Sequence, residues 1–146
     1  MKQEKLNILT QIKERRGERL LRKVYMYCTD DGRVPIKDFL GASGKKIQKK
    51  FEFMLNFIKN EKNVLCEPYV KHFSIEKYKL LYELRIRVSG TMVRIIFTYA
   101  DENIILLHAF YKRDHRDTEC ALEQALKLLN TFDDKVLEPF EHLMEV

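Results

Sequence analysis

Residues 80–113 read LLYELRIRVSGTMVRIIFTYADENIILLHAFYKR, and this stretch decides the fold. Three runs rich in apolar, β-branched and aromatic residues follow one another, which is typical of β-strands. Residues 89–90 (SG) separate the first two runs, and residues 100–103 (ADEN) separate the last two. Both separators are short and contain turn-forming residues. We therefore expect consecutive antiparallel strands joined by tight turns.

Helical patterns flank these strands. Residues 24–28 (VYMYC) predict a further strand, and Pro35 opens a short helix. Ser43 is the expected N-cap of a longer helix, and Asp117 is the expected N-cap of the last helix of the body. We expect an α+β fold with a small antiparallel sheet, made of the N-terminal strand and the three-stranded meander. Helices should pack against one face of this sheet.

The composition is that of a soluble globular domain. The chain has 146 residues, of which 45% are hydrophobic and 34% are charged, so it is able to bury a core. It lacks an apolar run long enough to span a membrane, and its first residues lack the pattern of a secretory signal. Three cysteines lie far apart in the sequence, which favours free thiols. We expect a cytoplasmic protein that has no membrane partner.

Charge divides the chain into a basic body and an acidic tail. Residues 133–146 carry a net charge of −4 and the remaining residues carry +9. We expect an N-terminal helical extension over residues 1–23, a domain over residues 24–132, and an amphipathic acidic tail over residues 133–146. The tail has helical spacing, and it either packs on the body as an extra helix or covers the basic face. A basic body suits a nucleic-acid partner, although many basic cytosolic proteins bind none.

Two arginines lie inside strand runs that are otherwise apolar. Strand alternation places Glu83, Arg85 and Arg87 on one side of the first strand, and Arg94 on one side of the second. Pairing across the hairpin brings Arg85 and Arg94 to the same face, where two guanidinium groups can hold a phosphodiester. The alternative is a solvent-exposed face on which Glu83 and other carboxylates neutralise the arginines.

Further cations follow the last strand. Lys112 and Arg113 end the quoted stretch, and His115 comes two residues later. Such a group is able to hold a nucleic-acid backbone, and His115 can transfer protons near neutral pH; a charged surface loop is the alternative. The lysines within residues 45–50 allow the same two interpretations. The histidines and cysteines lack the spacing of a metal site, so we expect neither a metal nor another cofactor.

Several motifs together resemble the HigB-like branch of the RelE/ParE toxin superfamily. They are VYMYCTDDGRVPIKDFL (24–40), EPYVKHF (67–73), LLYELRIRVSGTMVRIIFTY (80–99) and IILLHAFYKR (104–113). The resemblance covers about residues 24–129, and LYELRI and LLHAFYKR are its most specific parts. It implies a RelE/ParE-like fold and the toxin of a type II toxin–antitoxin system.

The resemblance also implies an activity. Toxins of this kind are similar to ribosome-dependent endoribonucleases that cut mRNA without a metal, by attack of a ribose 2′-OH on the adjacent phosphate. The residues implied for catalysis are Arg85, Arg94, Lys112 and His115, and those implied for RNA binding are Lys71, Arg87 and Arg113. The identity of the general base stays open between Lys112 and His115. The implied partners are mRNA on the ribosome and a cognate helix-turn-helix antitoxin.

The sequence departs from the family pattern just after Arg113. Family members often continue with T-x-K-T-P, whereas residues 114–118 here read DHRDT, with two acids and no proline. Two added carboxylates lower the positive potential next to the expected site. Two other functions stay open. One is a non-catalytic inhibitor of a protein target such as DNA gyrase, as in ParE-like relatives, and the other is a phage or accessory protein that lost toxicity.

Overall fold

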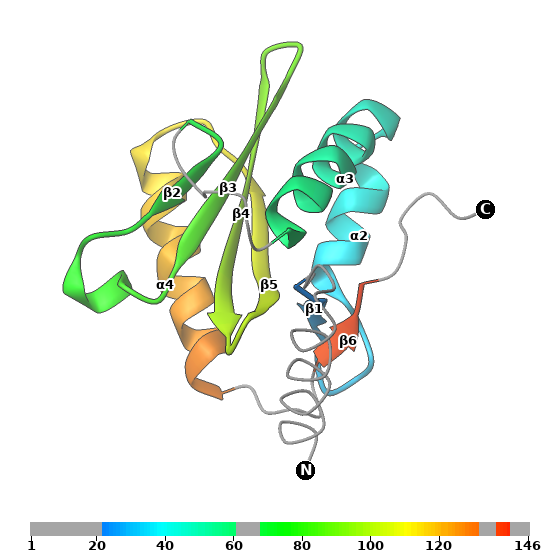
Figure 1. Cartoon of the computed structure of the whole chain (residues 1–146). Helices are drawn as coiled ribbons and strands as arrows, with labels where there is room; N and C mark the ends of the chain where they lie inside the picture. The colour runs from blue at the N-terminus through cyan, green and yellow to red at the C-terminus, as the bar shows by residue number, and fades with distance from the viewer. Residues whose placement is uncertain (1–21, 61–67, 132–136, 141–146) are drawn as a thin grey trace.

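The computed structural model describes residues 22–60, 68–131 and 137–140, which form a six-stranded sheet and three α-helices (Figure 1). The strands are β1 (Val24–Tyr27), β2 (Val70–His72), β3 (Tyr82–Val88), β4 (Thr91–Ala100), β5 (Asn103–Tyr111) and β6 (Leu137–Pro139). The helices are α2 (Pro35–Ala42), α3 (Lys45–Lys59) and α4 (His115–Thr131), and the 3-10 helix η1 (Glu76–Tyr78) precedes β3. The predicted α+β class is confirmed. Among the described helices, none is long and apolar enough to cross a membrane.

The sheet is mixed, with the strand order β2-β3-β4-β5-β1-β6. Strands β3 to β5 form the expected antiparallel meander, and β2 extends it at one edge. In contrast to the expected antiparallel arrangement, β1 pairs in parallel with β5, with Val24 opposite Ile104. Among the described residues, α2, α3, η1 and the strands β2 to β4 lie between β1 and β5. A connection of that length allows a parallel pairing, which a tight turn does not.

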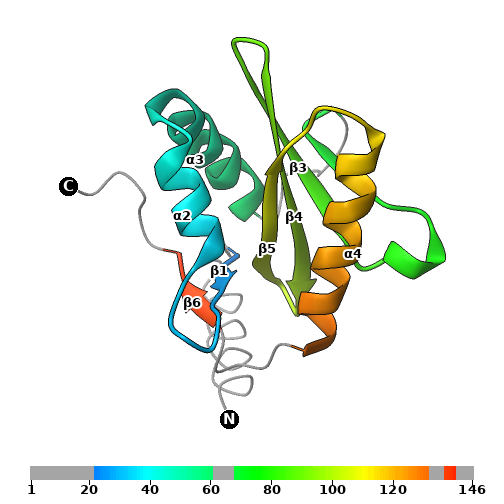
Figure 2. The ribbon, with the colours of Figure 1, turned by 180° about the vertical axis from the view of Figure 1, so that it is seen from behind.

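Helices cover both faces of the sheet, whereas one covered face was expected. In Figures 1 and 2, α2 and α3 lie on one side of the sheet and α4 lies on the other. Phe51 of α3 and Phe97 of β4 belong to the first buried cluster, and Leu122 of α4 and Ile96 of β4 belong to the second. The cause lies in β5, where the apolar run over residues 104–107 supplies buried side chains to both clusters. Such a run is typical of a strand that is covered on both faces.

The β3–β4 hairpin turns at Ser89-Gly90, as predicted. Both residues have positive φ, 48° at Ser89 and 82° at Gly90, as in a type I′ turn. A two-residue turn of this type fixes the register of the hairpin, in which Arg85 lies opposite Arg94. The tip of this hairpin extends beyond the helices (Figure 1).

Two helices begin at residues other than those predicted. α3 follows Gly44 and has no side-chain cap. The Ser43 hydroxyl, which was the expected cap, donates instead to the Leu40 carbonyl oxygen at 2.7 Å. α4 begins at His115, two residues before its expected N-cap Asp117. Short polar side chains can bond to either of two nearby backbone groups. The Ser43 hydroxyl bonds back to α2, and at α4 Asp114 accepts from the N–H groups of Arg116 and Asp117.

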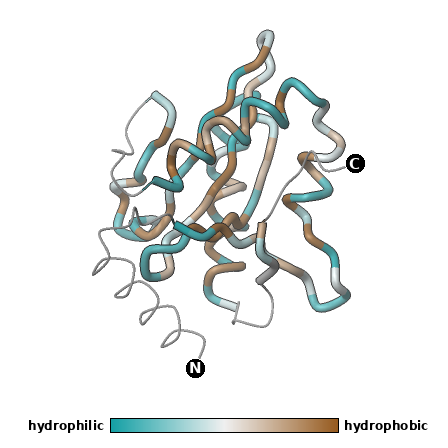
Figure 3. Tube along the Cα trace, turned by 45° about the vertical axis from the view of Figure 1, so that its right-hand side comes forward, coloured by the Kyte–Doolittle hydropathy of each residue, from teal (hydrophilic) through white to brown (hydrophobic). Residues whose placement is uncertain are grey.

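The described part of the acidic tail is a strand, whereas a helix was expected. β6 pairs antiparallel with β1, and Pro139 lies opposite Tyr25. An open sheet edge offers unpaired backbone groups to any extended segment, so edge pairing prevails here over helical spacing. Residues 1–21, which include nearly all of the expected N-terminal extension, lie outside the described residues, as do residues 132–136 and 141–146. Figure 3 shows that apolar and polar residues are interspersed along the described part of the chain.

Candidate functional site

Most of the predicted cations gather on the face of the sheet that carries α4. Residues that lie opposite each other in antiparallel strands share a face. The opposed pairs are Arg85 with Arg94, Lys71 with Glu83, and Arg87 with Met92. Their strand neighbours Leu84 and Val93 belong to the buried cluster under α2 and α3, so the cations point to the other side. The predicted juxtaposition of Arg85 and Arg94 is confirmed.

A buried carboxylate contacts both arginines. Glu83 is only 1% exposed, and its Oε1 accepts a hydrogen bond from Arg85 Nε at 2.9 Å. The same oxygen lies 3.8 Å from Arg94 Nε. A buried carboxylate is tolerated when cations and donors replace its lost hydration. Glu83, Arg85 and Arg94 therefore form one unit, called here the Glu83 triad.

The triad carries an excess of positive charge. Burial lowers the pKa of Arg94, Glu83 opposes that shift, and repulsion from Arg85 and Arg87 adds to it. An arginine nevertheless stays protonated in proteins. Three neighbouring guanidinium charges are thus balanced by a single buried carboxylate, which leaves this face able to attract an anion. The side chains of Arg85 and Arg94 are 23% and 11% exposed, so part of each reaches the surface.

The cations after β5 divide between the sheet face and the following turn. The Lys112 backbone N–H donates to the Met92 carbonyl oxygen at 2.9 Å, which extends the β4–β5 pairing and brings Lys112 to the same end of the sheet. Arg113 and His115 are exposed. Within the described ranges, neither of these two side chains is joined to the Glu83 triad by a hydrogen bond or an ion pair. Arg113 lies in the turn that leads into α4, and His115 is the first residue of that helix.

The two acids that depart from the family pattern stabilise the start of α4. Asp114 Oδ1 accepts hydrogen bonds from the N–H groups of Arg116 at 2.8 Å and Asp117 at 3.3 Å. Asp117 Oδ2 accepts from the N–H groups of Arg113 at 2.7 Å and Asp114 at 3.1 Å. This is a reciprocal cap of the capping-box type with Asp114 as the N-cap, so the predicted cap at Asp117 is wrong by three residues. The backbone hydrogen bonds lower the pKa of Asp117.

A pocket of about 330 Å³ between β5 and α4 was not indicated by the sequence. His108, Phe110 and Cys120 are among its lining residues. Phe110 lies opposite Arg94 in the β4–β5 register, and its ring stacks on that of His108 with centroids 6.0 Å apart. Burial lowers the pKa of His108 below its usual 6.5. Two stacked aromatic rings thus lie beside Arg94. Aromatic faces of this kind can stack nucleobases.

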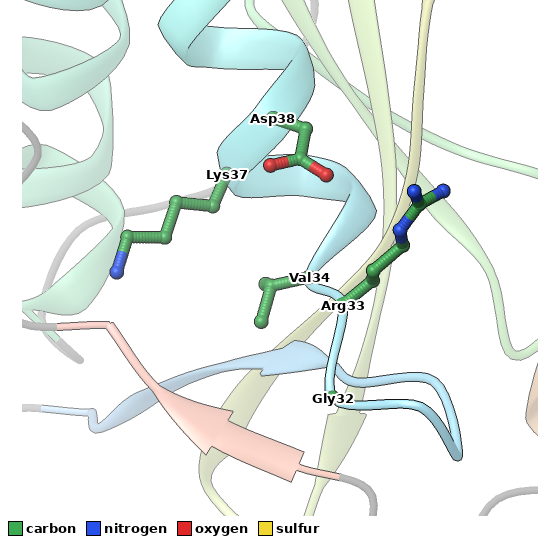
Figure 4. A pocket seen from close by; sticks show the side chains of 5 residues that line it. All are labelled: Gly32, Arg33, Val34, Lys37 and Asp38. Atoms are coloured by element: carbon green, nitrogen blue, oxygen red, sulfur yellow. The ribbon is translucent and has the colours of Figure 1, made fainter.

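A second pocket lies at the start of α2. It is lined by Gly32, Arg33, Val34, Lys37 and Asp38. Figure 4 shows the Arg33 and Lys37 side chains pointing in different directions. Because these two cations do not converge as Arg85 and Arg94 do, we assign no function to this pocket.

Comparison with known proteins places the chain in a family. Residues 38–130 match the family model described as phage derived protein Gp49-like (DUF891). Searches of curated proteins and of solved structures give no match. The matched residues contain β2 to β5, and with them the Glu83 triad and both rings of the neighbouring pocket. The chain therefore belongs to the phage-derived Gp49-like family, which is a family of RelE/HigB-like toxins.

Proposed function

We propose that this protein is a toxin of the HigB-like branch that cuts mRNA on the ribosome. The observation that carries the proposal is the pairing of Arg85 with Arg94 on one sheet face around a buried carboxylate. Lys71 and Arg87 lie on the same face in the flanking register positions. RNA offers a line of phosphates to such a face, and each guanidinium can hold two phosphate oxygens. Membership in a toxin family supports the same conclusion.

The proposed reaction is an attack of the ribose 2′-oxygen on the adjacent phosphorus. The bond from phosphorus to the 5′-oxygen of the next nucleotide breaks, which leaves a 2′,3′-cyclic phosphate and a 5′-hydroxyl. Arg85 and Arg94 would stabilise the added negative charge of the phosphorane. A base must take the 2′-OH proton and an acid must protonate the 5′-oxygen, and Lys112 and His115 are the candidates for these two roles.

Partners follow from the same proposal. Lys71, Arg87 and Arg113 would hold phosphates on either side of the cut, in an mRNA bound to the ribosome. A cognate helix-turn-helix antitoxin would keep the toxin inactive in the cell. A gene for a small helix-turn-helix protein directly beside this one would agree with that arrangement.

Expression in a bacterial host tests the proposal. The unaltered chain should arrest growth and fragment translated mRNA, as mapped from new RNA ends. Arg94→Ala should lower cleavage by about a hundredfold, because it removes a donor to the transition state. Arg94→Lys should restore only part of the activity, since a lysine keeps the charge and loses the planar fork. Arg33→Ala alters an exposed arginine far from the triad in the sequence and is the matched control.

The chemistry has a separate test. A ribosome-bound mRNA with a 2′-O-methyl group at the scissile nucleotide should resist cleavage, because the nucleophile is blocked. Cleavage of the methylated mRNA would reject the 2′-OH mechanism.

Growth arrest with intact mRNA and an SOS response would replace the nuclease proposal by inhibition of a protein target such as DNA gyrase. A folded protein that causes no arrest would indicate that toxicity has been lost.

A further inference from the structure

We propose that Glu83 is a positioning residue, which directs the guanidinium groups of Arg85 and Arg94 toward the scissile phosphate without touching RNA. The inference rests on the RNA-cleaving function proposed above and assigns a role to an acid within a basic face. Because Glu83 is only 1% exposed, a substrate cannot reach its carboxylate. A direct role as general base is therefore excluded for the conformation described, and an indirect role through the arginines is what its contacts allow.

Both arginines turn the same part of the guanidinium toward Glu83. In each case the atom nearest to Oε1 is Nε, at 2.9 Å for Arg85 and 3.8 Å for Arg94. With Nε directed to the carboxylate, the edge formed by the two terminal nitrogens is left for a pair of phosphate oxygens. The contact of Arg94 Nη2 with Met92 Sδ at 3.9 Å is a weak one that an anion can replace. Glu83 thus selects which edge of each arginine faces outward.

The two arginines are held to different degrees. Arg85 makes a full hydrogen bond to Glu83, whereas Arg94 Nε is buried and has no hydrogen-bond partner among the described residues. Glu83 Oε2 is also buried and without such a partner. Buried polar groups are usually paired, so these two atoms mark unused bonding capacity inside the triad. A shift of about 1 Å would bring Arg94 into hydrogen-bond range. We infer that Arg85 is the fixed guanidinium and Arg94 the adjustable one.

If Glu83 positions the arginines, its loss should change RNA affinity and the rate of RNA cleavage in opposite directions. A carboxylate this close to the arginines lowers the attraction of the face for RNA. A face that only had to bind RNA would bind it more tightly without the Glu83 carboxylate. If Glu83 orients the guanidinium groups, its removal should strengthen RNA binding and slow the chemical step. A purely structural residue would weaken both, because its loss disturbs the fold on which both depend.

The variant Glu83→Gln tests this separation. The amide keeps an oxygen for Arg85 Nε and loses the negative charge. We expect its affinity for a 2′-deoxy-substituted, uncleavable RNA to rise about threefold at low salt. We expect single-turnover cleavage of ribosome-bound mRNA to fall about tenfold or more. Glu76→Gln is the matched control, because it removes the same charge from an exposed glutamate whose side chain is 85% exposed in η1.

A second variant separates charge from geometry. Glu83→Asp keeps the charge but withdraws the carboxylate by one methylene, so cleavage should fall without the gain in affinity. If either variant cleaves at the wild-type rate, or if both lose binding and cleavage in equal measure, the positioning role is overturned. Thermal unfolding of each variant shows whether the fold is retained. If Glu83→Gln fails to fold, the Glu83→Asp result decides.

Inorganic phosphate gives a readout that does not depend on RNA cleavage. In a titration followed through the arginine Nε–H signals by NMR, we expect the Arg94 signal to shift and the Arg85 signal to stay nearly constant. In Glu83→Gln both signals should respond. Equal responses of the two arginines in the unaltered protein would refute the assigned asymmetry. If the protein binds phosphate in this way and cuts no RNA, the proposed function fails while the positioning of the arginines stands.

Discussion

The side chains of Asp114 and Asp117 each accept a hydrogen bond from the other's backbone N–H at the start of α4. We predict that Asp114→Ala lowers the free energy of unfolding by about 1 kcal/mol, because two N–H groups of the first turn lose their acceptor. Urea denaturation measures this change. Asp30→Ala, which alters an exposed aspartate before α2, is the control. An equal loss in both variants would contradict the capping role.

The cap also gives stability a dependence on acid pH. Hydrogen bonds from the Arg113 and Asp114 N–H groups hold the pKa of Asp117 below its usual 3.8. Since the folded pKa is the lower one, this contribution is fully present above the unfolded pKa and is lost as pH falls through the folded pKa. We predict that the stability advantage of the unaltered chain over Asp117→Asn shrinks as pH falls below about 4. Denaturation curves at several pH values would show a constant difference if the prediction is wrong.

His108 gives a second pH dependence in a different range. Burial holds the pKa of His108 below 6.5, so between its folded pKa and 6.5 the unfolded chain binds more protons than the folded chain. The free energy of unfolding should therefore decrease as pH falls from above 6.5 toward the folded pKa. We predict that His108→Gln removes part of this decrease. His115→Gln alters an exposed histidine and serves as the comparison; the prediction fails if both variants flatten the profile equally.

Because β5 is buried on both faces, adjacent residues of this strand contribute similarly to the free energy of unfolding. Ile104 is buried under α2 and α3, and Ile105 is buried under α4. We predict that Ile105→Ala lowers the free energy of unfolding by about 2–5 kcal/mol, as Ile104→Ala should. Chemical denaturation of the two variants compares them directly. A sheet with one face open to water would lose little stability from one of these two changes.

The hairpin turn offers a stabilising substitution. Ser89 has a φ of 48° and precedes Gly90 in a two-residue turn. Asparagine tolerates positive φ better than serine, and Asn-Gly is the preferred pair in a type I′ turn. We predict that Ser89→Asn raises the melting temperature by a few degrees. Gly90→Ala should lower it, because a side chain is strained at φ 82°.

The residues of the meander predicted the pairing of Arg85 with Arg94 well, because alternation and short turns are local properties. They placed Arg85 and Arg94 on one face, and the structure agrees. They did not reveal that Glu83 is buried, since alternation gives the side of a strand and not the depth of a side chain. Nor did they place the rings of His108 and Phe110 on the arginine face, because the β4–β5 register shift between Ile96 and Phe97 interrupts the alternation along β5.

Long-range contacts account for the other differences. The parallel pairing of β1 with β5 joins Val24 to Ile104 across most of the chain, and no local pattern specifies such a partner. The run of apolar residues over 104–107 was the available signal for two covered faces. The same run also fits an ordinary strand of a one-sided sheet, so it does not decide between the two. The capping pair at α4 is visible in the sequence as two acids three residues apart, but two acids at this spacing also fit a plain change of surface charge.

The position of β1 and β6 has a consequence for the order of folding. The meander β2–β5 pairs neighbours in sequence, whereas the other edge of the sheet is closed by β1 and β6 from the two ends of the chain. Local pairs form early and pairs of high sequence separation form late. The hairpins that carry Arg85 and Arg94 should therefore pair before β1 and β6 close the far edge of the sheet. A variant that disturbs only the β1–β6 edge would then leave the arginine-bearing strands paired.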